Sequence, residues 1–151
     1  MNEQSLEQLK IDEGFRSRAY HCTAGKLTIG YGYNMDANPL HLSSVEIAYA
    51  HTNGMPEIEA ERLLKLMVAQ CQKELEQHYY WFANLDEVRR GAVINMFYNL
   101  GYTRFSGFHN FIKSMEKGDY KKAALDGLDS EWHREDVPER SARLMVLIKT
   151  G

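Results

Sequence analysis

Apolar residues recur at helical spacing over most of the chain, and one stretch near the N-terminus breaks this pattern. Leu6 and Leu9 predict a short helix over residues 3–13, which Gly14 would end. Between residues 18 and 33 the helical spacing gives way to two short runs of β-type residues, Ala19-Tyr20-His21 and Leu27-Thr28-Ile29. The two runs predict a β-hairpin in which Gly25 takes a positive φ angle at the turn.

The remaining periodic segments predict helices of very different lengths. A small helix is expected from Ser43 or Ser44 to Ala50, and a long one over residues 57–80 carries Cys71 on its apolar stripe. Four more helices are expected at residues 86–101, 108–118 and 119–132, and from Pro138 onward. The pattern therefore predicts an α+β, mostly helical fold.

The length of 151 residues is that of one domain, residues 1–151. Within it we expect a small hairpin lobe at residues 14–58 and a larger helical lobe formed by residues 1–13 and 80–151. The long helix over residues 57–80 would join the two lobes.

Composition and charge exclude several classes of function. The net charge of −3, with scattered Lys and Arg, gives no basic patch for nucleic acid. The sequence contains no run of 18 apolar residues, so membrane insertion is not expected, and the polar N-terminus has no secretory signal pattern. Two distant cysteines, Cys22 and Cys71, predict reduced thiols, and no residue spacing predicts a metal site or a cofactor.

The chemically interesting side chains gather between residues 12 and 32, where Glu13, Cys22 and Thr28 lie among four glycines. By position alone, Glu13 is more simply an exposed charge at a helix end. A nucleophilic pair of Cys22 with its neighbour His21 is not expected, because adjacent strand residues point to opposite faces.

Eight residues separate Glu13 from Cys22, and five residues separate Cys22 from Thr28. By this spacing the chain resembles the phage-type lysozymes, the T-even bacteriophage endolysin family of muramidases. The resemblance extends over nearly the whole chain. It includes Ile11-Asp12-Glu13-Gly14, Thr28-Ile29-Gly30-Tyr31-Gly32, Asp86-x-Val88-Arg89-Arg90, Gly107-Phe108-x-Asn110, Trp132 and Pro138-x-Arg140 with Arg143. Tyr33 departs from the family pattern, which usually has His at this position.

The resemblance implies a glycoside hydrolase that cleaves the β-1,4 bond between N-acetylmuramic acid and N-acetylglucosamine in bacterial peptidoglycan. Glu13 would be the general acid, and Arg140 would orient it while Arg143 pairs with Asp12. Carbonyl groups at a helix end favour the protonated acid and Arg140 favours the ionised one, a balance that the sequence leaves open.

For Cys22 the sequence leaves two roles open. With Thr28 it would place and deprotonate a water molecule, which inverts the anomeric carbon, or its thiolate would attack directly, which retains the configuration. The family resemblance favours water placement.

The family's sugar-contacting positions correspond to Asn34, Tyr98, Phe111 and Asp126, and Tyr98 is equally explained by core packing. The implied setting is a monomer that accumulates in the cytoplasm of an infected bacterium. A separate holin-type membrane permeabiliser would then release it to the glycan strands. Two alternatives stay open: a lytic transglycosylase that uses Glu13 alone, and an inactive wall-binding module.

Overall fold

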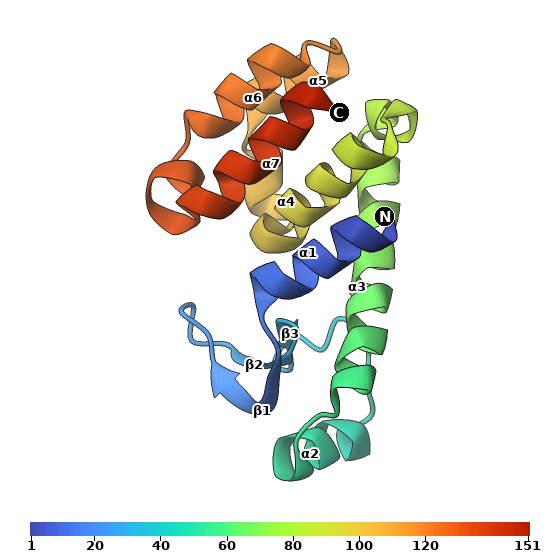
Figure 1. Ribbon diagram of the computed structural model, residues 1–151. Helices are drawn as coiled ribbons and strands as arrows, with labels where there is room; N and C mark the ends of the chain where they lie inside the picture. Colours follow the sequence, from blue (N-terminus) through green and yellow to red (C-terminus); the bar gives the residue numbers. More distant parts are fainter. The chain divides into compact units, whose positions relative to one another are not determined.

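The computed structural model describes residues 1–151 as ten main helices and strands (Figure 1). In chain order they are α1 (Glu3–Glu13), β1 (Arg16–His21), β2 (Leu27–Gly30), β3 (Tyr33–Asn34), α2 (Ser44–Asn53), α3 (Glu57–His78), α4 (Glu87–Ser106), α5 (His109–Glu116), α6 (Tyr120–Leu128) and α7 (Pro138–Thr150). A short 3₁₀-helix, η1 (Tyr80–Asn84), and a one-turn π-helix, η2 (Trp132–Asp136), complete the chain. The predicted α+β, mostly helical fold is confirmed. None of the helices combines the length and the apolar character that crossing a membrane requires.

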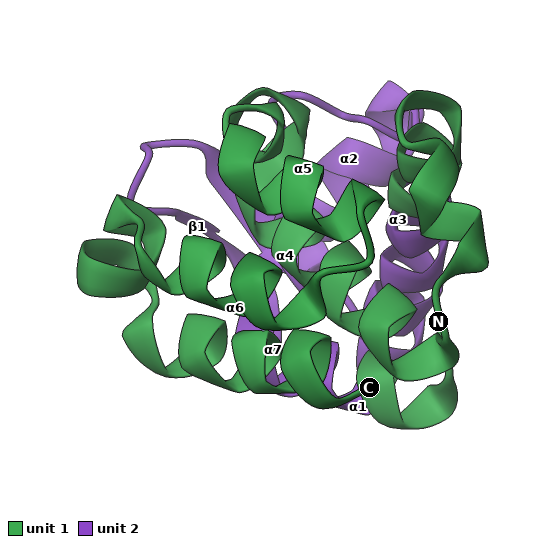
Figure 2. Cartoon of the chain, turned by 90° about the horizontal axis from the view of Figure 1, so that it is seen from above, with its two compact units in different colours: residues 1–6, 71–151 green, residues 7–70 purple.

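The chain divides into two compact units, coloured purple and green in Figure 2. We call residues 7–70 the hairpin unit and residues 1–6 with 71–151 the helical unit. The borders between the units fall within α1 and α3. The lobe borders expected from the sequence stay a prediction.

The hairpin unit contains a three-stranded antiparallel sheet in the order β1-β2-β3. Tyr20 of β1 and Asn34 of β3 both pair with Thr28 of the central strand β2. The predicted hairpin is confirmed. Gly25 in its turn has a φ angle of 74°, a backbone conformation that is strained for residues with a side chain. The sequence did not predict β3, because two residues are too few to show an alternating pattern.

Helix α2 begins with a complete capping box. The Ser43 hydroxyl accepts the N–H of Glu46, whose carboxylate accepts the N–H of Ser43 in return. The predicted start at Ser43 or Ser44 is confirmed. The helix continues past Ala50 to Asn53, where Gly54 ends it with a φ angle of 82°.

In the helical unit, α4 forms the centre of the core and most of its first three turns are buried. Phe105, near the end of α4, is completely buried and makes edge-on ring contacts with Tyr79, Phe97 and Phe111. Helix α7 packs against α4 and α6, and α6 also packs against α5. Buried and partly buried aromatic rings from three segments therefore join α4 to α5 and to the chain before α4.

Other predicted helix ends also differ from the structure. Gly101 is a kink with φ 72° inside α4, after which a further turn reaches Ser106. The long helix α3 ends at His78, two residues early, and is followed by η1. The helix expected to reach Trp132 ends at Leu128, where the Ser130 hydroxyl donates to the carbonyl of Gly127 at 2.6 Å. A local side-chain bond of this kind competes with helix continuation.

Candidate active site

Glu13 is the last residue of α1, and its side chain is partly buried. Gly14 follows with a φ angle of 69° and donates its N–H to the carbonyl of Lys10 at 2.9 Å, so it ends the helix as predicted. Lys10 also contacts a carboxylate oxygen of Glu61 on α3 at 3.1 Å. This ion pair joins the last turn of α1, which carries Glu13, to α3 within the hairpin unit.

Cys22 and Thr28 lie on either side of the β1–β2 turn and share one backbone acceptor. The N–H of Cys22 donates to the carbonyl of Lys26 at 3.0 Å, and the Thr28 hydroxyl donates to the same oxygen at 2.9 Å. The turn closes through a bond of 2.8 Å from the N–H of Gly25 to the carbonyl of Cys22. The structure thus brings the predicted thiol and hydroxyl together.

The environment of the turn favours the ionised form of Cys22. Hydrogen bonds from the backbone N–H of Lys26, then of Ala24, lower the pKa of the Cys22 thiol, although partial burial opposes them. The neighbouring Thr28 side chain lowers the pKa to a lesser extent. N–H groups that converge on one atom favour its ionised form. Cys71 on α3 has the opposite environment, because burial raises the pKa of its thiol to about 12. Cys22 is therefore the more reactive of the two thiols.

Thr28 is nearly inaccessible, at 5% exposure, whereas Cys22 and Asn34 are partly exposed. Asn34 lies beside Thr28 on β3, and its side-chain oxygen accepts the N–H of Ala37 at 2.9 Å. That bond orients the Asn34 amide and leaves its NH₂ group as the donor. Cys22, Thr28 and Asn34 thus form one cluster at the sheet.

Tyr33, at the position where the family usually has His, is 2% exposed. Its hydroxyl donates to the side-chain oxygen of Asn38, and the Asn38 amide bonds to both backbone groups of Leu42. Tyr33 therefore supports the loop before α2, which is a packing role.

Arg140 and Arg143 lie one turn apart on α7 in the helical unit. Arg140 is 8% exposed, and its Nε donates to the side-chain oxygen of Asn95 on α4 at 2.8 Å. This bond fixes part of the guanidinium on α4. Asp12, in the hairpin unit, accepts a bond of 3.2 Å from the Gln8 amide on the same helix.

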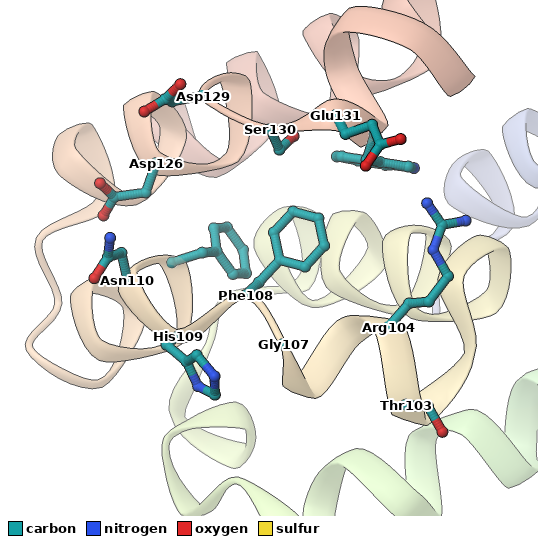
Figure 3. Close-up of a pocket in the computed structure, with 12 residues that line it drawn as sticks. Thr103, Arg104, Gly107, Phe108, His109, Asn110, Asp126, Asp129, Ser130 and Glu131 are labelled. Carbon is teal, nitrogen blue, oxygen red and sulfur yellow. The ribbon is translucent and has the colours of Figure 1, made fainter.

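A cavity of about 520 Å³ opens in the helical unit between the end of α4, the start of α5 and the segment after α6 (Figure 3). Asp126, Asp129 and Glu131 come from one wall, while Arg104, Phe108 and Asn110 come from the other. Two predicted site residues, Phe111 and Asp126, line this cavity.

The two predicted residues differ in what they can offer a ligand in the cavity. Phe111 is 1% exposed and packs edge-on against Phe105, so it contributes mainly to the wall. The Asp126 carboxylate accepts the Ser114 hydroxyl at 2.6 Å and lies 3.2 Å from Lys122. Tyr98 on α4 is partly buried.

Sequence reasoning missed the Lys26 carbonyl and two carboxylates on the cavity wall, Asp129 and Glu131. The carbonyl belongs to the backbone, which every residue has, so no residue type identifies it. Asp129 and Glu131 lie in a short segment after α6 without periodicity, where Asp and Glu are most simply solvent-exposed. No group of three or more His, Cys, Asp or Glu side chains is arranged to hold a metal ion.

Comparison with known proteins gives the family. The family model described as phage lysozyme matches residues 10–144. A probable T4-type lysozyme of Dictyostelium discoideum is 29% identical over 159 residues, covering 96% of this chain and 93% of that protein. The endolysin of Acyrthosiphon pisum secondary endosymbiont phage 1 is 27% identical, covering 99% of this chain and 90% of its own length.

A third relative is a longer protein, of which only one part is similar to this chain. The pre-baseplate central spike protein Gp5 of Enterobacteria phage T4 is 28% identical over 99% of this chain, which spans 28% of that protein. Since the family model covers most of the sequence, the chain belongs to the phage lysozyme family and is a glycoside hydrolase of the lysozyme type.

Proposed function

We propose that the protein hydrolyses the β-1,4 bond between N-acetylmuramic acid and N-acetylglucosamine in bacterial peptidoglycan, with Glu13, Cys22 and Thr28 as the catalytic residues. The observation that carries the proposal is the turn around Lys26. It brings the Cys22 thiol and the Thr28 hydroxyl together, and its N–H groups favour the thiolate. A thiolate in this position can replace the second carboxylate that inverting glycosidases use.

In the proposed reaction Glu13 donates its proton to the glycosidic oxygen while the C–O bond to the muramic acid breaks. The Cys22 thiolate accepts a proton from a water molecule, whose oxygen bonds to the anomeric carbon from the opposite face. The reaction leaves Glu13 ionised and Cys22 protonated, and one proton moved from Cys22 back to Glu13 through solvent restores the enzyme.

Thr28 would hold this water. Its hydroxyl proton is directed to the Lys26 carbonyl at 2.9 Å, so its oxygen is free to accept a hydrogen from the water. The other water hydrogen would point to Cys22, and a lone pair would then face the sugar. Such positioning of a nucleophile contributes to rate by lowering the entropic part of the barrier.

Arg140 would orient Glu13, and Arg143 would pair with Asp12 beside it. Two observations support the assignment for Arg140: Asn95 holds its guanidinium from α4, and its low exposure restricts its movement. An arginine beside a carboxylate can fix its orientation through paired N–H groups.

Four residues are proposed to contact the substrate: Asn34, Tyr98, Phe111 and Asp126. Asn34 would donate its NH₂ group to a sugar oxygen next to the Cys22–Thr28 pair. Tyr98 would stack on a sugar ring. Asp126 would accept a hydroxyl or amide N–H of the substrate in the cavity, where Phe111 supplies an apolar wall.

Host lysis at the end of phage infection is the biological role that we propose, because one relative at 90% coverage is an endolysin. In this role a monomer would wait in the bacterial cytoplasm until a separate holin-type protein permeabilises the membrane. The Dictyostelium relative and the phage spike protein show that related chains also occur in other settings.

The test is digestion of purified peptidoglycan followed by mass spectrometry of the products. Wild-type protein is expected to clear a wall suspension and to leave reducing ends on muramic acid, and Glu13→Gln is expected to clear none. Anhydro-muramyl ends would instead identify a lytic transglycosylase and overturn the proposal. A wild-type protein that leaves the walls intact would also overturn it.

A further inference from the structure

The peptide group between Lys26 and Leu27 connects the site to a residue outside it. Its carbonyl accepts the N–H of Cys22 at 3.0 Å and the hydroxyl of Thr28 at 2.9 Å. Its N–H, on the opposite side, donates to a carboxylate oxygen of Asp36 at 2.8 Å. One peptide group therefore links Asp36 to both members of the catalytic pair.

Asp36 lies in the turn that follows β3, and its carboxylate reaches back to β2. The neighbouring residue Met35 donates its N–H to the carbonyl of Leu27 at 2.8 Å. Residues 35 and 36 thus hold Leu27 at both its N–H and its carbonyl. Asp36 is exposed to solvent, so its negative charge needs no buried partner to compensate it.

We propose that Asp36 is a positioning residue for the reaction, which fixes the Lys26–Leu27 peptide and through it the Cys22–Thr28 pair. The inference rests on the proposed function of that pair. Asp36 itself touches neither the substrate nor the reacting atoms.

The physical reason is the rigidity of the peptide group. The peptide is planar and trans, so its N–H and carbonyl point in opposite directions. An acceptor that fixes the N–H therefore also fixes the carbonyl toward Cys22 and Thr28. A hydrogen bond to an ionised carboxylate is shorter and stronger than one to a neutral group, and it polarises the peptide so that its carbonyl accepts more strongly.

A purely electrostatic role for Asp36 predicts the opposite result from positioning. A carboxylate near a thiol disfavours the thiolate, so removing its charge would speed the reaction of Cys22 with an alkylating reagent. Loss of positioning would slow that reaction, because a Lys26–Leu27 peptide that is free to turn also displaces Lys26 itself. The N–H of Lys26, which belongs to the preceding peptide, would then point less well to the sulfur. The direction of the change thus distinguishes the two roles.

The experiment measures the alkylation rate of Cys22 by iodoacetamide at pH 7, together with kcat and KM on soluble glycan fragments. Asp36→Ala is expected to slow alkylation by about threefold or more, since the rate follows the thiolate fraction. Its kcat should fall roughly tenfold with KM changed less than twofold, because misplaced catalytic groups act on the chemical step. Asp36→Asn, which keeps a side-chain oxygen as acceptor, should restore most of both.

Ser43→Ala is the matched control, since it removes one side-chain acceptor in the same unit, at the start of α2. It should leave the alkylation rate and kcat unchanged. If Asp36→Ala does not fold by circular dichroism, Asp36→Ser, which is too short to reach Leu27, replaces it.

Three results would overturn the inference: an Asp36→Ala protein that alkylates as fast as wild type or faster, an Asp36→Asn protein as impaired as Asp36→Ala, or equal impairment of Ser43→Ala. Failure of the proposed function has a different signature. In that case, wild-type protein with Cys22 fully alkylated would still clear walls, whatever Asp36 does to the alkylation rate.

Discussion

Thr28→Val separates the contribution of one hydroxyl to catalysis from its contribution to stability. Valine has nearly the shape of threonine, so the change removes the hydroxyl from a side chain that is 5% exposed and opens little space. In the folded protein that hydroxyl donates to the Lys26 carbonyl and lies beside the Cys22 thiol. The substitution therefore tests the proposed water-holding group directly.

The stability cost of Thr28→Val should be small. The Lys26 carbonyl keeps its bond of 3.0 Å from the N–H of Cys22, so no buried acceptor loses its last partner. Loss of one hydrogen bond whose acceptor keeps another donor lowers the free energy of unfolding by about 1 kcal/mol. The kcat, in contrast, should fall by about 100-fold, which is roughly 2.7 kcal/mol of lost transition-state stabilisation.

Cys22 should keep most of its reactivity in the same variant. The N–H groups of Lys26 and Ala24 contribute more to lowering the pKa of the Cys22 thiol than Thr28 does, and both remain. Alkylation of Cys22 should therefore slow only slightly. A large loss of kcat with an almost normal thiol would show that Thr28 acts on the water molecule rather than on Cys22.

The assay is wall clearing and kcat on glycan fragments at 25 °C, with urea unfolding of the same preparations. Thr28→Ser, which keeps the hydroxyl, is the control and should retain more activity than Thr28→Val. The reasoning is refuted if folded Thr28→Val keeps more than about one third of the wild-type kcat, a loss too small for a group that positions the nucleophile.

Further predictions concern the acid, the two thiols and one glycine. Glu13→Gln should fold with wild-type circular dichroism and lose all measurable clearing; residual activity above a few per cent would remove Glu13 as the acid. At pH 7 Cys22 should alkylate faster in the folded protein than in urea, because folding lowers the pKa of its thiol. Cys71, with a pKa raised to about 12, should alkylate faster in urea, and peptide mapping of labelled samples checks both directions. Gly30→Ala should destabilise the protein by about 2–4 kcal/mol, since φ is 66° and the added Cβ would lie 3.1 Å from that of Ala60; an unchanged urea midpoint contradicts this.

The elements that carry the site could be predicted because local sequence determines them. Gly14 ends α1 directly after Glu13, and Gly25 allows the turn that separates Cys22 from Thr28. The side-chain spacing then places the thiol and the hydroxyl on the same hairpin. These features depend on residue type and short-range geometry, which a single sequence contains.

Other features depend on tertiary contacts, and the sequence did not show them. The shared Lys26 carbonyl is a backbone group, and the reach of Asp36 to Leu27 depends on how the turn after β3 folds back onto β2. The cavity in the helical unit forms between segments that are more than ten residues apart in the sequence, Thr103–Phe111 and Asp126–Trp132. Helical periodicity predicted the helices on either side but not the space between them.

The central claim is that Cys22 and Thr28 place a water molecule opposite the bond that Glu13 protonates. The most direct test is the anomeric configuration of the newly formed reducing end, read by proton NMR within the first minutes of digestion, before mutarotation. Because the cleaved bond is β, the account predicts that the α-anomer appears first. If the β-anomer appears first, the configuration is retained, and the water-placing role of Cys22 and Thr28 is contradicted.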